Sequence, residues 1–303
     1  MTDFEPAYIR SNRSGLLKQR VMEARRRLRS CCLCPRRCNV DRTGRHKTGV
    51  CNTFEKAWVS SFHPHFGEEA PLVGLHGSGT VFFTHCNLLC NFCQNYDISH
   101  LGVGHEVTDA QLASMMLSLQ NEGCHNINFV TPSHVVPMIL SAVEMACTQG
   151  LTIPLVYNSG GYDRVETLRL LDGVFDIYMP DFKFWDLDMA EMTCHAPDYA
   201  EVVRKAIREM YRQVGDLVLD KRGIAQRGLL VRHLVLPEGK ASTREIMRFI
   251  SREISTNTYV NIMSQYRPCG SVTGIKPFHR SVSRGEFMDA LSAAKAEGIT
   301  RLD

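Results

Sequence analysis

Six short apolar runs, each followed by an amphipathic segment, dominate the sequence from about residue 75 to its end. The apolar runs cover residues 80–84, 127–131, 153–158, 175–180, 229–236 and 259–263. The amphipathic segments cover residues 109–122, 135–149, 163–171, 198–214, 243–254 and 284–297. This alternation predicts parallel strands joined by right-handed helical crossovers. Eight such units close a TIM barrel, so six predict an α/β fold of the open or partial (β/α)6 barrel type over residues 75–303.

Polar residues at the expected helix starts support these boundaries. Thr108, Ser133, Ser242 and Ser283 each stand just before an amphipathic segment. A side-chain oxygen at such a position can accept a hydrogen bond from the free backbone N–H groups of the first turn. We therefore expect these four residues to cap their helices.

Residues 1–74 have a different character and predict a cysteine-rich N-terminal extension. Between Arg13 and Lys47 there are about twelve Lys and Arg residues against two acidic residues, and residues 16–29 have a helical pattern. The stretch Phe62–Gly67 is rich in histidine, proline and glycine and is interpreted as a loop. The charge favours a solvated basic surface. Nucleic acid is an alternative partner that is not favoured, because no aromatic residues interleave the charges.

Twelve cysteines in 303 residues are unusual unless many of them bind something. The N-terminal residues lack the apolar core of a secretory signal, and no apolar run approaches the length of a membrane span. These features predict a cytoplasmic protein with no membrane contact. In a reducing compartment cysteines serve more often as thiolate ligands than as disulfides, so their spacing is informative.

Cys86, Cys90 and Cys93 follow the first predicted strand at C-x3-C-x2-C spacing. In barrel folds the loops after the C-terminal ends of the strands carry the chemistry. Three thiolates can hold a [4Fe–4S] cluster while leaving one iron open for a substrate. A structural zinc site would normally be closed by four ligands, so the spacing favours a catalytic cluster.

This motif, with the aromatic Phe92 before its last cysteine, resembles that of the radical S-adenosylmethionine (SAM) superfamily. More narrowly, Gly77-Ser78-Gly79-Thr80, Cys93-Gln94-Asn95 and the Cys31–Cys51 segment resemble an uncharacterised branch of pyruvate formate-lyase activating enzyme homologues. The resemblance implies a partial barrel in which cluster-bound SAM is cleaved reductively to a 5′-deoxyadenosyl radical that abstracts hydrogen. It also implies that Phe92 lies near the adenine.

The same resemblance implies SAM contacts at the other strand ends. Asn158 and Ser159 follow the third strand, Asp181 and Lys183 follow the fourth, and Gln265 follows the sixth. After the second strand the family's Gly-Gly-Glu-Pro-like segment is absent, and Thr131 is the substitute that we expect. An acid, a base and an amide suit the ammonium, carboxylate and ribose groups of SAM, because charge-assisted hydrogen bonds are strong.

A second cysteine group lies in the extension, where Cys31, Cys34, Cys38 and Cys51 have C-x2-C-x3-C-x12-C spacing if Cys32 is spare. Four thiolates make a closed site for zinc or for a second iron–sulfur cluster, and the spacing leaves both open. Since this segment has little apolar core, we expect its order to depend on the metal, and we expect it to lie against the barrel mouth. Cys124, Cys147 and Cys194 are interpreted as packing residues.

The predicted function is therefore reductive cleavage of SAM for hydrogen abstraction from a protein or peptide, as in a glycyl-radical activase. This oxidoreductase would need a reductant such as flavodoxin or ferredoxin. A radical SAM enzyme that acts on a small metabolite is one alternative. A non-catalytic iron–sulfur binding or electron-transfer protein is another.

Overall fold

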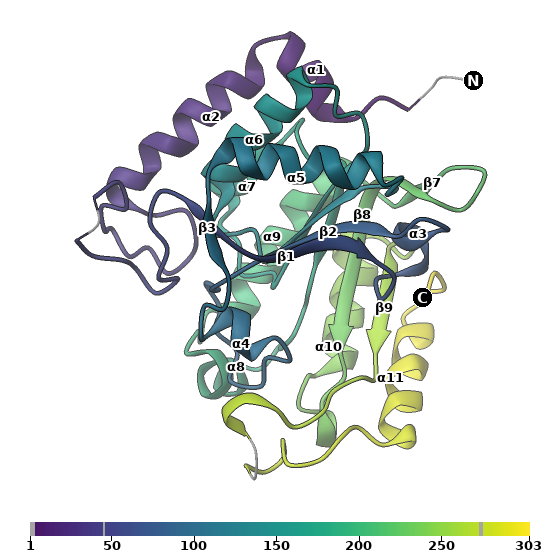
Figure 1. Cartoon of the computed structure of the whole chain (residues 1–303). Helices are drawn as coiled ribbons and strands as arrows, with labels where there is room; N and C mark the ends of the chain where they lie inside the picture. The colour runs from purple at the N-terminus through teal and green to yellow at the C-terminus, as the bar shows by residue number, and fades with distance from the viewer. Residues whose placement is uncertain (1–3, 45, 273–274) are drawn as a thin grey trace.

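All six predicted strands are present, and they pair in parallel with one another in the order β2-β4-β5-β6-β8-β9. The computed structural model describes residues 4–44, 46–272 and 275–303. Within them the sheet has nine strands: β1 (Ala57–His65), β2 (Ser78–Phe83), β3 (His105–Val107), β4 (Ile127–Val130), β5 (Leu155–Ser159), β6 (Ile177–Pro180), β7 (Val218–Leu219), β8 (Ala225–Leu234) and β9 (Tyr259–Met263). The sheet is strongly twisted and is not closed, since β3 and β9 lie at different ends of it (Figure 1). The α/β class is confirmed, whereas closure toward a barrel is not.

Strand β1 corrects the interpretation of residues 62–67 as a loop. It pairs antiparallel with β2, from Val59 opposite Phe83 to His65 opposite Ser78. Pro64 is tolerated because β3 pairs only with residues 57–59 of β1, so the other edge of β1 is free at the proline. Proline and histidine therefore suggested a loop, although the segment is a strand that forms hydrogen bonds with a neighbouring strand along only one of its edges at this point.

The helices match the predicted segments closely. They are α1 (Ala7–Arg13), α2 (Leu16–Arg26), α3 (Ala70–Val73), α4 (Tyr96–Ser99), α5 (Asp109–Asn121), α6 (Val136–Thr148), α7 (Val165–Leu171), α8 (Leu187–Cys194), α9 (Tyr199–Val214), α10 (Thr243–Phe249) and α11 (Arg284–Ala296). Short helical turns are η1 (Arg27–Ser30), η2 (Pro237–Gly239), η3 (Ile250–Ile254) and η4 (Gly270–Val272). The sequence analysis did not predict α1, α3, α4 or α8.

Two of the four predicted helix caps are confirmed. Thr108 and Ser283 each form a reciprocal capping box with the residue three positions later, Gln111 and Glu286. The prediction for Ser242 was wrong, because its side chain makes no cap hydrogen bond. Ser133 lies two residues before the cap position of α6, and it instead donates to Asp163 Oδ1 at 2.6 Å.

Helices α1 and α2 lie over α6 and α7, at the top of the molecule in Figure 1. Tyr8, Leu17 and Ala24 are fully buried and belong to the same core as the sheet and its helices. Tyr8 OH donates to Ile153 O at 3.0 Å, and Ala7 N donates to Asp176 Oδ1 at 2.8 Å. The start of the chain is therefore integrated with the βα units, and the domain boundary at residue 74 stays a prediction.

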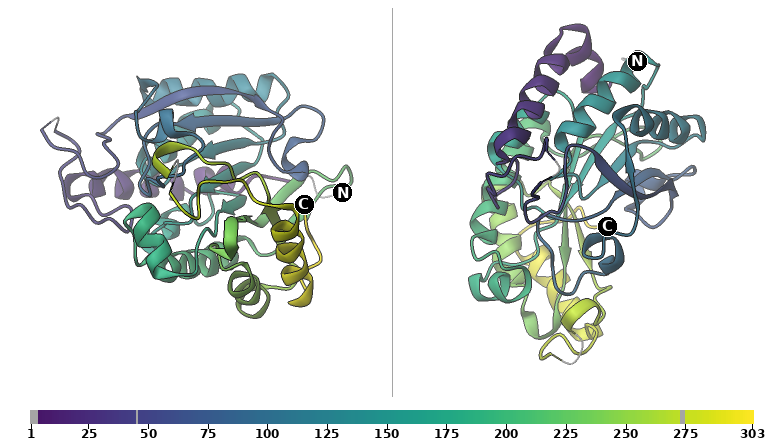
Figure 2. Two further views of the ribbon diagram at one scale, coloured as in Figure 1. Left: turned by 90° about the horizontal axis from the view of Figure 1, so that it is seen from below. Right: turned by 60° about the vertical axis from the view of Figure 1, so that its left-hand side comes forward.

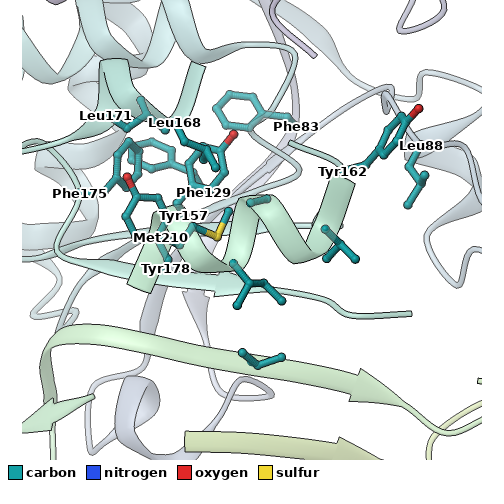
Figure 3. Packing of buried hydrophobic residues seen from close by; sticks show 14 of the residues in the cluster. Phe83, Leu88, Phe129, Tyr157, Tyr162, Leu168, Leu171, Phe175, Tyr178 and Met210 are labelled. Carbon is teal, nitrogen blue, oxygen red and sulfur yellow. The ribbon is translucent and has the colours of Figure 1, made fainter. Parts of the chain in front are cut away.

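Aromatic side chains fill the core between the sheet and its covering helices (Figure 3). Phe129, Tyr157 and Phe175 pack edge to face, with ring centroids 5.2–5.9 Å apart. On the other face of the sheet, Leu72 of α3 packs with Val156, Ile177, Met179 and Leu230. Both faces of the central strands are thus covered, which agrees with their nearly continuous apolar sequences. In the part of the chain that the structure describes, no helix has the length and apolarity needed to cross a membrane.

Candidate active site

The loop after β2 carries Cys86, Cys90 and Cys93, and its backbone is held in a tightly constrained form. His85 and Leu89 have φ values of 63° and 57°, in the left-handed region that costs a residue with a side chain about 1 kcal/mol. The Leu88 N–H donates to Cys86 Sγ at 3.3 Å. Burial raises the pKa of the Cys86 thiol to about 12, and the neighbouring Cys90 adds to the shift. Buried, mutually close thiols of this kind become strong ligands only when a metal displaces their protons.

One cavity at the C-terminal ends of the parallel strands contains every residue predicted for the cluster and for SAM. Its lining includes Cys86, Cys90, Phe92, Cys93, Thr131, Asn158, Ser159, Asp181, Lys183 and Gln265. These residues are supplied by β5 and by the loops that follow β2, β4, β6 and β9. Parallel pairing brings them together because it aligns all of these strand ends at one edge of the sheet.

Asp181 is the centre of a buried charge network in this cavity. Its carboxylate accepts from Lys183 Nζ at 2.6 Å and from Arg232 Nε at 2.8 Å. The same guanidinium donates to Asn158 Oδ1 at 2.8 Å and lies 3.6 Å from Glu68 Oε2. Burial alone would raise the pKa of Asp181, but Arg232 and Lys183 outweigh it and hold that pKa below its usual range. Burial would lower the pKa of Lys183, but Asp181 and Cys90 raise it instead, so the Asp181–Lys183 pair is fully ionised.

The sequence analysis named neither Arg232 nor Glu68 among the residues of the site. The Arg232 side chain nevertheless joins Asp181, Asn158 and Glu68. Its place two residues before the end of β8 was the available signal. Glu68 precedes α3 in a stretch without a motif, so nothing in the sequence pointed to it. Burial raises the pKa of Glu68, while the nearby Arg232 opposes that shift.

Thr131 and Ser159 line the cavity, but each also forms a hydrogen bond with a neighbouring residue of the protein. Thr131 has a φ of 63°, and its N–H donates to Asn158 O at 2.9 Å. Ser159 Oγ donates to Asp163 Oδ2 at 2.5 Å, and Tyr157 OH donates to Asp163 Oδ1 at 2.9 Å. Asp163 thus fixes the turn after β5 from beneath, which leaves the backbone of that turn facing the cavity.

The chain after β9 forms a second wall of the cavity, which includes Gln265 and packs against Phe92 of the cysteine loop. The Phe92 ring is stacked on the Phe278 ring, with an interplanar angle of 8°. Its centroid also lies 6.0 Å from the centroid of the Tyr266 ring. Gln94 Nε2 donates to Gln265 O at 2.9 Å. Packing therefore accounts for the aromatic at position 92 independently of any adenine contact.

Two further cysteines lie beside the cluster motif. Cys194 was interpreted as a packing residue of a helix, but its Sγ is 3.3 Å from Cys90 Sγ. Cys269 Sγ donates to Phe92 O at 3.0 Å. The position of Cys194 at the C-terminal end of α8 gave no sequence signal, because α8 itself was not predicted.

Cys31, Cys34, Cys38 and Cys51 all lie in the irregular segment after η1. Burial raises the pKa of Cys34, and the thiols of Cys51, Cys31 and Cys38 add to that shift. All twelve cysteines are free thiols. Within residues 4–44, 46–272 and 275–303, no three His, Cys, Asp or Glu side chains already surround a common point as in a closed ion site. Metal binding at either cysteine group would therefore require the thiols to draw together.

Arg36 connects this segment to the loop after β2. Its guanidinium donates to Asn87 O at 2.9 Å, to Leu88 O at 3.1 Å and to Cys194 O at 2.6 Å. It also lies over the Tyr162 ring, 5.3 Å from the centroid. The cysteine-rich segment, at the left of Figure 1, thus contacts the loop after β2 and the C-terminal end of α8.

The sequence of the chain is similar to that of one curated protein. It is 30% identical over 295 residues to Uncharacterized protein MJ0674 of Methanocaldococcus jannaschii, covering 95% of this chain and 80% of that protein. The chain belongs to the family of this archaeal protein. No model of a protein family matches the sequence. A crystal structure of a radical SAM methyltransferase from Sphaerobacter thermophilus aligns with a TM-score of 0.49 and 16% identity, over 74% of this chain and 65% of that one, just under two thirds of its length.

Proposed function

We propose that the chain is a radical SAM enzyme whose cluster is held by Cys86, Cys90 and Cys93. The observation that carries the proposal is the single cavity in which these three thiols meet Asp181, Lys183 and Asn158. Three thiolates on one loop provide a ligand set with one position left for a substrate. When bound, a [4Fe–4S] cluster supplies the electron that cleaves SAM to methionine and a 5′-deoxyadenosyl radical.

The chain's own residues would bind and orient SAM. The Lys183 ammonium and the Asp181 carboxylate offer charge-assisted partners to the methionyl carboxylate and ammonium groups. Asn158 offers an amide beside them, although its Oδ1 is already held by Arg232. Because Asp181, Lys183 and Arg232 already hold one another in place, little reorganisation is needed when SAM arrives.

The cavity wall that contains the stacked rings of Phe92 and Phe278 would keep water from the radical. Its rings pack on one another rather than on solvent, and Phe92 and Phe278 are only 4% and 1% exposed. The Ser271 N–H donates to Asn91 O at 2.8 Å, which ties the chain after β9 to the cysteine loop. A closed wall would also keep dissolved reductants and other hydrogen donors away from the carbon radical, which they would otherwise quench.

A protein or peptide is the substrate class that we propose, as for a glycyl-radical activase. Large apolar side chains are exposed on both sides of the cysteine loop, with Leu101 66% and Val103 55% exposed after α4 and Met192 44% exposed on α8. Asn91 Nδ2 donates to Met192 O at 3.1 Å, so α8 adjoins the loop. Exposed apolar groups around a site favour contact with another polypeptide.

Formation of 5′-deoxyadenosine tests the proposal. Anaerobically reconstituted protein, given SAM and a strong reductant, should release it, and SAM should change the electron paramagnetic resonance signal of the reduced cluster. The Cys86→Ala, Cys90→Ala, Cys93→Ala variant should lose both properties, whereas Cys147→Ser, on α6, should keep them. A triple variant that retained the SAM-dependent signal would refute the site. Wild-type protein that bound a cluster without cleaving SAM would favour electron transfer instead.

The substrate class needs its own measurement. The candidate substrate proteins carry the deuterium, and SAM is unlabelled. Transfer of the label into 5′-deoxyadenosine then identifies the protein from which hydrogen was abstracted. Transfer from a polypeptide supports the activase-like reading. Transfer only from a low-molecular-weight extract would support a metabolite as the substrate.

A further inference from the structure

We propose that Cys31, Cys34, Cys38 and Cys51 bind a tetrathiolate metal centre of net negative charge, with the buried Arg42 as its counter-cation. The centre is either a zinc ion or a second iron–sulfur cluster, both of which take four thiolates. This proposal goes beyond SAM chemistry and does not depend on it, because the two cysteine groups lie in separate segments.

Arg42 is the first observation that requires an anion. Its side chain is among the largest buried ones, with 1% exposure. It donates to Phe54 O at 2.9 and 3.2 Å and to His134 O at 2.9 Å. Across the described ranges no carboxylate forms an ion pair with it, and its remaining contact is Cys31 Sγ at 3.6 Å. Arginine stays protonated in proteins, and a buried charge without a counter-ion is costly.

Thiolates bound to a metal would provide that counter-ion. A zinc ion or a [4Fe–4S] core with four thiolate ligands carries net negative charge, whereas four protonated thiols carry none. Arg42 already contacts one of the four sulfur atoms. The Arg42 guanidinium therefore lies where it would neutralise the negative charge of the metal-bound thiolates. The four protonated thiols of the metal-free form carry no charge for it to neutralise.

The backbone of the segment is the second observation. Arg37, Asn39 and Asn52 have φ values of 42°, 53° and 44°. Each of these left-handed residues costs about 1 kcal/mol, and such strain persists only where the surroundings enforce it. The local apolar cluster consists only of Leu28, Cys31 and Leu33, with Val40 against it. Hydrophobic packing of this size adds little to the backbone hydrogen bonds that hold the segment, whereas metal ligation would hold the conformation firmly.

Local contacts bring the distant fourth ligand to the other three. The Val50 N–H donates to Cys38 Sγ at 3.4 Å, one residue before Cys51. A Cβ atom at Gly49 would lie 2.7 Å from Cys38 Sγ, so only glycine allows this approach. N–H donation to a cysteine sulfur is the kind of contact that stabilises a metal-bound thiolate.

The decisive experiment removes the other cysteine group first. The Cys86→Ala, Cys90→Ala, Cys93→Ala variant of the full chain should still contain about one zinc ion, or the iron and sulfide of one cluster. X-ray absorption should show a first shell of sulfur at about 2.3 Å, and the absorption edge distinguishes zinc from iron. Because all N-terminal cysteines remain intact, misfolding of that segment cannot confuse the result. Absence of stoichiometric metal overturns the proposal.

Single substitutions then test the ligands and the counter-cation in that background. Cys34→Ser should lose most of the metal, whereas Cys32→Ser, its neighbour outside the ligand set, should keep it. Arg42→Gln should release the metal at roughly tenfold lower chelator concentration, a change equivalent to about 1.4 kcal/mol. Lys47→Gln removes an exposed positive charge from the same segment and should leave retention unchanged. Equal metal retention in Arg42→Gln and Lys47→Gln would refute the role of Arg42.

Discussion

At the scale of single residues, Asp181 joins the fold to the cavity through one carboxylate. It neutralises Lys183 and Arg232, and all three side chains are at most 18% exposed. The same residues line the cavity. A substitution here should therefore change both stability and ligand binding, and the two effects need separate measurements.

Replacement of Asp181 by alanine should lower the free energy of unfolding by about 3–5 kcal/mol, because it leaves the buried Lys183 without a carboxylate and Arg232 with only the more distant Glu68. Urea denaturation measures the loss. Glu201→Ala breaks the exposed Lys205–Glu201 pair of α9 and should leave the free energy of unfolding nearly unchanged. A loss below about 1 kcal/mol for Asp181→Ala would mean that the network does not stabilise the fold.

His233 should make stability depend on pH. It is fully buried, with its ring bound to Phe182 O and Thr243 Oγ1, and burial lowers its pKa to about 4. The unfolded chain takes up the proton near pH 6.5. Stability should therefore be complete above pH 6.5 and should fall by roughly 3 kcal/mol as the pH drops from 6.5 to 4.

Comparison of one variant with the wild type isolates this effect. His233→Gln should reduce the slope of unfolding free energy against pH between 6.5 and 4, whatever its cost at neutral pH. His134, whose pKa burial lowers to about 3, contributes a residual slope of the same sign. An identical slope in His233→Gln and wild type would contradict the prediction.

At the scale of elements, the turns at the strand ends are built around close backbone contacts. After β5, Gly161 has a φ of 76°, and a Cβ there would lie 2.2 Å from Asp181 O. This approach sets the spacing between the turn after β5 and the turn after β6. The cavity wall at Asn158 and Asp181 therefore depends on a residue that carries no side chain.

Gly161→Ala should destabilise the protein by about 2–4 kcal/mol, through the left-handed backbone and the forced separation of the two turns. Gly150→Ala is the matched control, since Gly150 has a φ of 98° but nothing within 4 Å of its added Cβ. The control should cost only about 1 kcal/mol. Thermal or urea denaturation of both variants measures the difference, and equal losses would show that the close contact is not limiting.

At the scale of the whole molecule, the two parts of the N-terminal region are stabilised in different ways. Helices α1 and α2 lie on α6 and α7 and share the main core (Figure 2). The cysteine-rich segment after them is irregular and contacts the loop after β2 and the end of α8 through Arg36. Helices α1 and α2 therefore belong energetically with the sheet, whereas we expect the following segment to depend on its own ligands.

Removal of residues 1–14 should destabilise the entire molecule, because it exposes the surface that Tyr8 covers and leaves Asp176 without its bond from Ala7. Burial raises the pKa of Asp176 to about 7, so a carboxylate without that bond is poorly tolerated. Differential scanning calorimetry should give one transition in the full chain and a midpoint lower by several degrees in the truncated chain. An unchanged midpoint would show that α1 is dispensable.

The sequence by itself determined the six βα units, their parallel order and the position of the cysteine loop. Apolar periodicity and helix-cap chemistry are local properties, so Thr108, Ser283 and the bounds of β9 could be predicted. The cysteine spacing is also local, which is why Cys86, Cys90 and Cys93 could be placed on one loop without a structure. Family resemblance then supplied Asp181, Lys183 and Gln265.

Only the tertiary structure decided which distant groups meet. The antiparallel β1, the Asp181–Arg232–Glu68 network, the contact between Cys194 and Cys90, and the burial of Arg42 all join residues far apart in the chain. Such pairings depend on the twist of the sheet and on which side chains are desolvated together. Neither property has a local signature, because the free energy of a buried charge is set by its partners in space rather than by its neighbours in sequence.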